Sequence, residues 1–144
     1  MDKEQFFTLF EDKVQSKLKL FCNKINTSKA DLYILMARKA ACFVTALEEL
    51  NMISLDGKVI SERILDTKID LCDVKSVTII DDVVISGTTL NRTITRLIEL
   101  KPDLEINLVL IGINKKWFNP DMLTDISGKS FLEKPYTELD DSQC

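Results

Sequence analysis

Apolar residues recur along the chain in two patterns, and each pattern predicts one type of secondary structure. From Phe6 to Leu18 they recur every four residues between charged positions, which predicts an amphipathic helix over residues 2–22. Further along, short uninterrupted apolar runs predict strands that are buried on both faces, as in a parallel sheet. Turn-forming residues at 26–28 and at 56–57 separate the first of these segments.

The predicted elements after the first helix alternate between strands and helices. The strands are expected at 32–36, 59–65, 77–81 and 106–113, and the helices at 39–50 and from the threonines at 88–89 to a point before Pro102. This order predicts an α/β domain in which helices flank a central, mainly parallel sheet. After residue 115 the sequence becomes irregular.

The length of 144 residues supports one hydrophobic core, so we expect a single domain. Within it, residues 1–30 would form an N-terminal helix and cap, residues 31–114 the α/β core, and residues 115–144 an irregular, hood-like segment. The chain could also be one domain of a longer protein.

Composition and charge narrow the classes of function. The formal net charge of −4 gives no reason to expect nucleic acid as a partner. The acidic start and the absence of a long apolar stretch predict a soluble, cytoplasmic protein without a membrane partner. Four widely spaced cysteines and no histidine argue against a disulfide framework, a structural zinc site and histidine-dependent catalysis.

The candidate chemistry lies in the run from Val77 to Leu90. An apolar strand there is followed by Asp81 and Asp82, and then by a loop rich in hydroxyl groups that opens a helix. Carboxylates at the carboxyl end of a strand can hold hydroxyls or a hydrated metal ion, and N–H groups at a helix start suit a phosphate. The run therefore indicates a sugar phosphate site, although a solvated strand end or a helix cap would use the same residues.

This run resembles the phosphoribosyl-pyrophosphate motif of the type I phosphoribosyltransferases. The resemblance implies that Asp81 and Asp82 contact the ribose hydroxyls and form the catalytic pair. It also implies that the rest of the motif binds the sugar and its 5′-phosphate, through Ile85, Ser86, Gly87, Thr88 and Thr89. In this family, pyrophosphate leaves C1 of the ribose through an oxocarbenium-like state.

An upstream segment supports the same resemblance. The strand at 32–36 would lead into a pyrophosphate-binding loop at 37–40, with Ala37, Arg38 and Lys39 as the binding residues. A Mg²⁺ ion would be held chiefly by the ligand, with the two aspartates assisting through water. An ordinary exposed pair of cations before a helix is the alternative interpretation of Arg38 and Lys39. The binding role is favoured, because basic residues at a helix N-terminus oppose the macrodipole unless an anion is present.

Three features depart from the family pattern. The loop at 37–40 contains no glycine, and residues 55–69 are the only candidate for a mobile catalytic loop. Ile85 stands where the 6-oxopurine salvage branch carries a carboxylate facing the base, which argues against a hypoxanthine or guanine acceptor. The base would then be held by the hood, for which Trp117 is a candidate stacking platform.

A second, weaker resemblance is to phosphoribosyltransferase-like domains of uncharacterised bacterial multidomain proteins, some of them linked to conflict or defence systems. It rests on five short segments, which are Arg38–Ala40, Ser61–Arg63, Asn119–Asp121, Lys134–Tyr136 and Leu139–Asp141. A module that senses phosphoribosyl pyrophosphate or a nucleotide without turnover is the main alternative to an enzyme. A receiver-like signalling domain is less favoured. The acidic pair of a receiver follows the first strand, whereas the pair in this chain follows the third predicted strand. A homodimer or attachment to further domains is compatible with all of these.

Overall fold

The centre of the molecule is a five-stranded sheet in which every neighbouring pair of strands is parallel. The computed structural model describes residues 4, 5, 8, 12–66, 71–84, 88–114 and 137–139. The strands are β1 (Leu32–Leu35), β2 (Lys58–Ser61), β3 (Ser76–Val84), β4 (Glu105–Asn114) and β5 (Thr137–Leu139), in the spatial order β2-β1-β3-β4-β5. The predicted α/β class with a parallel sheet is confirmed.

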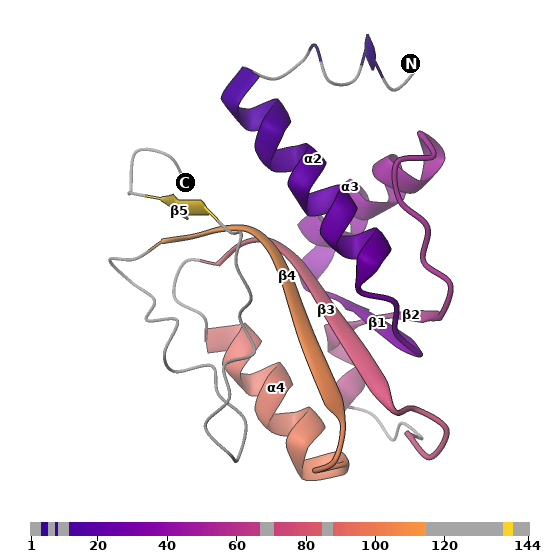
Figure 1. Ribbon diagram of the computed structural model, residues 1–144. Coiled ribbons are helices and arrows are strands. Elements are labelled where there is room, and N and C mark those ends of the chain that lie inside the picture. Colours follow the sequence, from indigo (N-terminus) through magenta and orange to yellow (C-terminus); the bar gives the residue numbers. More distant parts are fainter. Residues whose placement is uncertain are drawn as a thin grey trace.

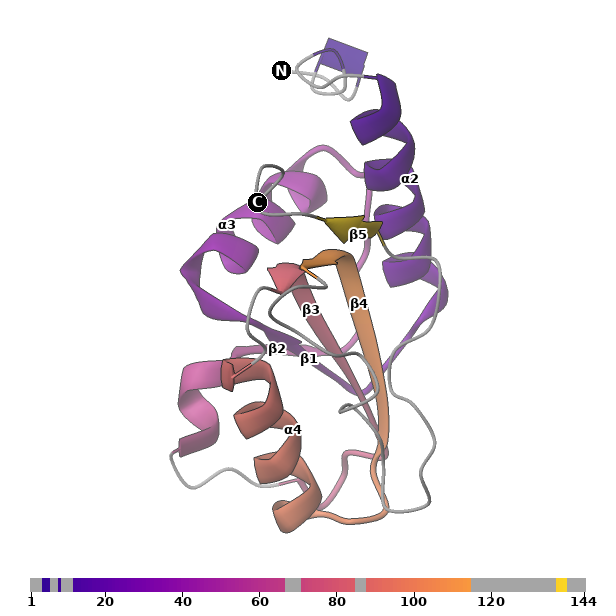
Figure 2. The ribbon, with the colours of Figure 1, turned by 90° about the vertical axis from the view of Figure 1, so that its left-hand side faces the viewer.

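Helices cover both faces of this sheet. On one face lie α2 (Asp12–Thr27) and α3 (Ala37–Glu49), and on the other lies α4 (Thr88–Leu100), beside the short 3₁₀ helix η1 (Glu62–Asp66), as Figures 1 and 2 show. Within the described part of the chain, no helix is long and apolar enough to cross a membrane.

The sheet separates two hydrophobic cores, and its central strands contribute to both. In β1, Leu32 and Ile34 belong to the core under α4, whereas Tyr33 and Leu35 belong to the core under α2 and α3. All four side chains are buried. A strand covered on both faces needs no polar alternation, which is why uninterrupted apolar runs were sufficient to predict β1, β3 and β4.

Two predicted boundaries in the first half of the chain are wrong. Helix α2 continues through Asn26 and Thr27, where the sequence predicts a turn. The Asn26 amide group donates to the Met52 carbonyl and accepts from the Ser54 N–H, so long-range contacts stabilise this last turn. The strand predicted to reach residue 65 ends at Ser61 and is followed by η1.

Two further differences lie at the carboxyl end of the sheet. Strand β3 does not end at Asp81, as predicted, but continues to Val84, because it keeps pairing with β4 after β1 has ended. Strand β5, which was not predicted, falls within the segment expected to be irregular and pairs with Gly112–Asn114 at the end of β4. Residues 115–136 of that segment lie outside the described residues.

Candidate functional site

The topology of the sheet marks one position as suited to a ligand. From β1 the chain passes through α3 to β2 on one side, and from β3 it passes through α4 to β4 on the other. In open α/β sheets, ligands bind outside the carboxyl ends of the strands at such a switch point. The two predicted halves of the sugar phosphate site follow β1 and β3, the strands on either side of it.

The backbone brings these two halves side by side. Leu35 of β1 is in register with Ile80 of β3, and the Met36 N–H donates to the Ile80 carbonyl at 3.0 Å. Helix α3 begins at the next residue, Ala37, so its first turn lies beside Asp81. Asp81 is half-buried, and the backbone of Asp82 continues in β3 beyond the end of β1.

The start of α3 differs from the expected pyrophosphate loop. Ala37, Arg38 and Lys39 form the first turn of the helix, so the prediction of a loop at 37–40 is wrong. Alanine at 37 and 40 and the absence of glycine favour helix at these positions.

This helix start is electrostatically unusual. Met36 occupies the N-cap position, and no side-chain capping hydrogen bond from it is formed among the described residues. The first turn carries two cations and no acidic residue, so its charges oppose the helix macrodipole. A bound anion would offset both the dipole and the cations.

Helix α4 begins where the phosphate-binding part of the motif was placed. Thr88 and Thr89 are its first two residues and both are exposed, whereas the Leu90 side chain is buried in the core. The other motif residues, Ile85 to Gly87, lie outside the described residues, as does Trp117. The structure therefore sets the start of α3 beside Asp81 and begins α4 at Thr88, with three residues between it and the end of β3.

The donor set fits a magnesium ion that is shared with a ligand. Among the described residues there is no cluster of three or more His, Cys, Asp or Glu side chains that could hold a metal ion. Mg²⁺ is commonly bound by one or two carboxylates together with water and substrate phosphates. Asp81, half-buried in β3 just beyond the end of β1, offers one such carboxylate without an all-protein cage.

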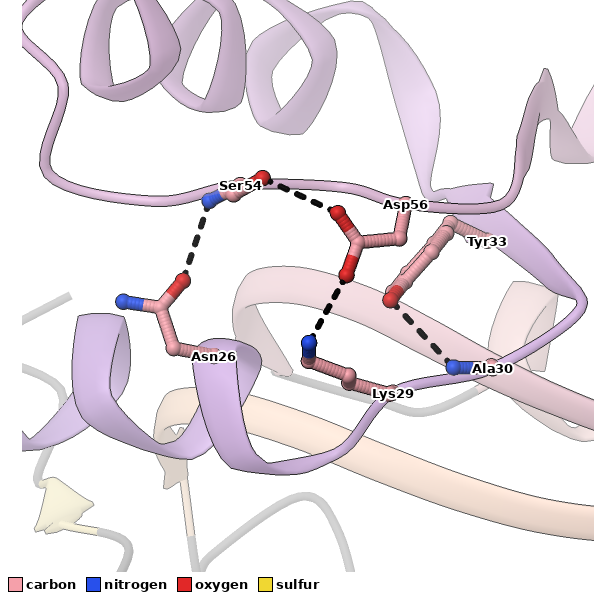
Figure 3. Close-up of polar contacts among 6 residues, drawn as sticks. All are labelled: Asn26, Lys29, Ala30, Tyr33, Ser54 and Asp56. Carbon is pink, nitrogen blue, oxygen red and sulfur yellow. Dashed lines mark hydrogen bonds and ion pairs between the residues drawn. The ribbon is translucent and has the colours of Figure 1, made fainter.

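The amino end of the sheet carries a polar network of a different kind (Figure 3). Lys29 Nζ lies 3.0 Å from Asp56 Oδ2, and the Ser54 hydroxyl donates to Asp56 at 3.1 Å. The hydrogen bond from Lys29 lowers the pKa of Asp56, and the same bond raises the pKa of Lys29. Asn26, Lys29, Ser54 and Asp56 also line an open depression of about 450 Å³. Since these polar groups pair with one another, we assign the depression a structural role.

One residue near the candidate site was missed by the sequence analysis. Thr93 is 5 % exposed and lies on the buried face of α4 with Leu90, Ile94 and Leu97. The signal that could have found it is its spacing, because position 93 falls within the apolar stripe of that helix.

Comparison with known proteins supports the fold. No protein-family model and no curated protein matches the sequence. Three solved structures superpose with a TM-score of 0.50. A xanthine-guanine-hypoxanthine phosphoribosyltransferase from Helicobacter pylori is 13 % identical over 91 % of this chain and 84 % of that one. A hypoxanthine-guanine-xanthine phosphoribosyltransferase is 17 % identical over 90 % and 75 %. A hypoxanthine phosphoribosyltransferase from Staphylococcus aureus is 15 % identical over 88 % and 74 %.

The chain has the type I phosphoribosyltransferase fold. The phosphoribosyltransferases to which it is similar are named for purine substrates, but identities of this size establish the fold and not the substrate. That Ile85 excludes a 6-oxopurine acceptor therefore stays a prediction from the sequence.

Proposed function

We propose that the protein binds phosphoribosyl pyrophosphate as its Mg²⁺ complex at the switch point between β1 and β3. The observation that carries this proposal is the pairing of the two strands, which the hydrogen bond from the Met36 N–H to the Ile80 carbonyl extends to the start of α3. It sets the start of α3, whose first turn contains Arg38 and Lys39 in sequence, beside the part of β3 that contains Asp81, as a ligand with pyrophosphate next to vicinal hydroxyls requires.

Each part of the ligand is assigned to one part of the site. Asp81 and Asp82 accept hydrogen bonds from the ribose hydroxyls, and the backbone and side chains of Ala37, Arg38 and Lys39 hold the pyrophosphate. The 5′-phosphate is held by the segment from Ile85 to Thr89. Bound Mg²⁺, assisted by the two aspartates, supplies positive charge to the pyrophosphate oxygens.

The transferase form of the proposal adds one chemical step. The bond between C1 of the ribose and pyrophosphate breaks, and its electron pair leaves with pyrophosphate. A lone pair of the acceptor then forms the new bond to C1. Asp81 and Asp82 hold the ribose in place, while Arg38 and Lys39 stabilise the charge that develops on the leaving group.

A binding module without turnover is the second candidate, and one observation favours it. The pyrophosphate-binding segment at 37–39 is helical and contains no glycine, so a rearranged peptide there would be costlier than in a glycine-rich loop. Such a module would use the same contacts to sense the ligand.

Ligand-dependent unfolding tests the binding proposal. Phosphoribosyl pyrophosphate at about 100 times its Kd, with Mg²⁺, should stabilise the native state by about 2.7 kcal/mol and raise the Tm. The double variant Asp81→Asn/Asp82→Asn should lose this shift, because neutral amides accept hydrogen bonds from the ribose hydroxyls less strongly than carboxylates do. Its Tm without ligand should stay near the wild-type value.

Asp103→Asn, an exposed change in the turn before β4, is the matched control and should keep the full shift. No shift for folded wild-type protein at millimolar ligand would contradict the proposal. Unfolding of the double variant would mean instead that the aspartates are structural. Pyrophosphate release in the presence of a panel of bases then separates the transferase from the binding module.

Several finer expectations remain proposals beside this one. They are the division into a helix and cap at 1–30, a core at 31–114 and a hood at 115–144, a homodimer, a cytoplasmic location, and kinship with domains of bacterial defence proteins. The hood is supported by one feature, since β4 ends and β5 begins at the carboxyl edge that carries the candidate site.

A further inference from the structure

We infer that Thr93 is a positioning residue for the phosphate-binding turn of α4; this rests on the proposed function and adds to it a residue outside the motif. Thr93 and Thr78 are the two buried polar residues among those the structure describes. A buried hydroxyl is costly unless it is hydrogen-bonded, and both of these are. Thr78 donates to the Ser28 carbonyl, far from the site, whereas Thr93 donates to the Thr89 carbonyl at 2.9 Å.

The bond from Thr93 acts on the first turn of α4. In an α-helix the Thr89 carbonyl already accepts the N–H of residue 93, so the hydroxyl is its second donor. A threonine hydroxyl that bonds to the carbonyl four residues earlier often bends a helix at that point, so this second donor affects the direction of the Thr89 peptide group.

Because the peptide bond is planar, the hydrogen bond from Thr93 also affects the N–H group on the other side of the same peptide bond. The Thr89 carbonyl and the Leu90 N–H belong to the same peptide plane, so fixing one direction fixes the other. The Leu90 N–H is among the first N–H groups of α4, which have no partner within the helix. Thr93 therefore orients one of the backbone donors that would face the 5′-phosphate, while the buried Leu90 side chain anchors the same residue from the core.

A side chain at position 93 that served only to pack against the core would not need a hydroxyl group. The neighbours of Thr93 on the buried face are Leu90, Ile94 and Leu97, and valine is branched at Cβ as threonine is but carries a methyl group in place of the hydroxyl. Replacing Thr93 by valine would leave the Thr89 carbonyl with its helical N–H donor, so no buried group would lose its last partner.

The test compares Thr93→Val with two matched variants. Thr93→Ser keeps the hydroxyl. Thr45→Val removes a hydroxyl bond of the same kind, from Thr45 to the Ala41 carbonyl at 2.8 Å, on an exposed face of α3. The dissociation constant for ribose 5-phosphate is measured by calorimetry, and the Tm without ligand is measured beside it.

We expect Thr93→Val to weaken ribose 5-phosphate binding by about three- to tenfold, the effect of one ordinary hydrogen bond, with little change in Tm. Thr93→Ser and Thr45→Val should bind as wild type does. Equal affinity of wild type and Thr93→Val would overturn the inference alone, as would an equal loss in Thr93→Ser or Thr45→Val. Failure of wild type to bind either ribose 5-phosphate or phosphoribosyl pyrophosphate would overturn the proposed function and this inference together.

Discussion

The two ends of the sheet use their polar groups in different ways. At the amino end, polar side chains form hydrogen bonds with the backbone of neighbouring elements. Asp31 accepts the N–H groups of Lys75 and Ser76, and the Thr78 hydroxyl reaches the Ser28 carbonyl. At the carboxyl end, α3 starts with two cations in its first turn, and β3 carries two acidic residues past the end of β1. The amino end is organised for stability, and the carboxyl end carries local charge arrangements that favour a ligand.

The connection between α3 and β2 shows how closely the amino end is packed. Helix α3 ends in a Schellman motif, in which the Asn51 N–H donates to the Glu48 carbonyl and the Met52 N–H donates to the Leu47 carbonyl. Asn51 takes the left-handed conformation that this motif needs, with φ of 57°. Gly57 then passes directly against the backbone that leads into β1.

The strongest test of this comparison is Gly57→Ala. A Cβ at position 57 would collide with the Ala30 carbonyl oxygen and lie 2.7 Å from the Asp31 carbonyl oxygen. Because backbone atoms must shift to admit it, we expect a loss of about 3 kcal/mol in the free energy of unfolding, measured with urea. Ligand affinity per folded molecule should be unchanged.

Asn51→Gly in the same connection is the matched control for this change. It should cost nothing, since glycine adopts positive φ freely. If the Gly57→Ala protein were as stable as wild type, the backbone at the amino end could shift to admit the extra methyl group. The amino end would then not be more tightly packed for stability than the carboxyl end.

Removal of charge at the start of α3 should increase the free energy of unfolding, whereas Gly57→Ala should decrease it. Arg38→Gln/Lys39→Gln keeps residues with good helix propensity but removes two cations that oppose the helix dipole. We expect the ligand-free protein to gain about 0.3–1 kcal/mol and the affinity for phosphoribosyl pyrophosphate to fall. Urea unfolding and calorimetry measure the two effects.

Lys75→Gln, an exposed change at the amino end, should alter neither quantity. A loss of stability in the double variant would mean that Arg38 and Lys39 support the fold. In that case they would belong with the structural residues of the other end.

The smallest effect is expected for the exposed pair Lys29–Asp56. The bond from Lys29 lowers the pKa of Asp56 below 3.8, so its stabilisation is present above that pH and is lost as the pH falls through the lowered value. The same bond raises the pKa of Lys29 above 10.5, so its stabilisation is present below that pH and is lost as the pH rises further.

Between about pH 5 and 9 both groups keep their charge, and the stability difference between wild type and Lys29→Met should be small and independent of pH. Urea midpoints at several pH values measure it. A slope within this range would show that another titrating group contacts the pair.

The parts of the fold that could be predicted are those with local causes. Uninterrupted apolar runs predicted β1, β3 and β4, and an amphipathic pattern that follows two threonines predicted α4. The end of α2 could not be predicted, because the Asn26 side chain is bonded to residues 52 and 54, far away in sequence. The three-residue strand β5 depends wholly on the edge of β4 that it joins.

The candidate site divides in the same way. The acidic pair and the threonines that open α4 stand in one continuous run, so the motif was visible in the sequence. The resemblance predicted that Arg38 and Lys39 serve the same site, and the register of β1 with β3 adds that the start of α3 lies beside Asp81. The place of Thr93 in the apolar stripe of α4 could have predicted its burial, but not the hydrogen bond from its hydroxyl to the Thr89 carbonyl.

Strand β5 has a consequence for how such a protein can diversify. By pairing with Gly112–Asn114, it ties the far end of residues 115–136 back to the strand from which they leave. Closing a loop between fixed ends costs only about 0.6 kcal/mol more for each doubling of its length. Insertions between Asn114 and Thr137 should therefore cost little stability and leave the pairing of β4 with β5 in place.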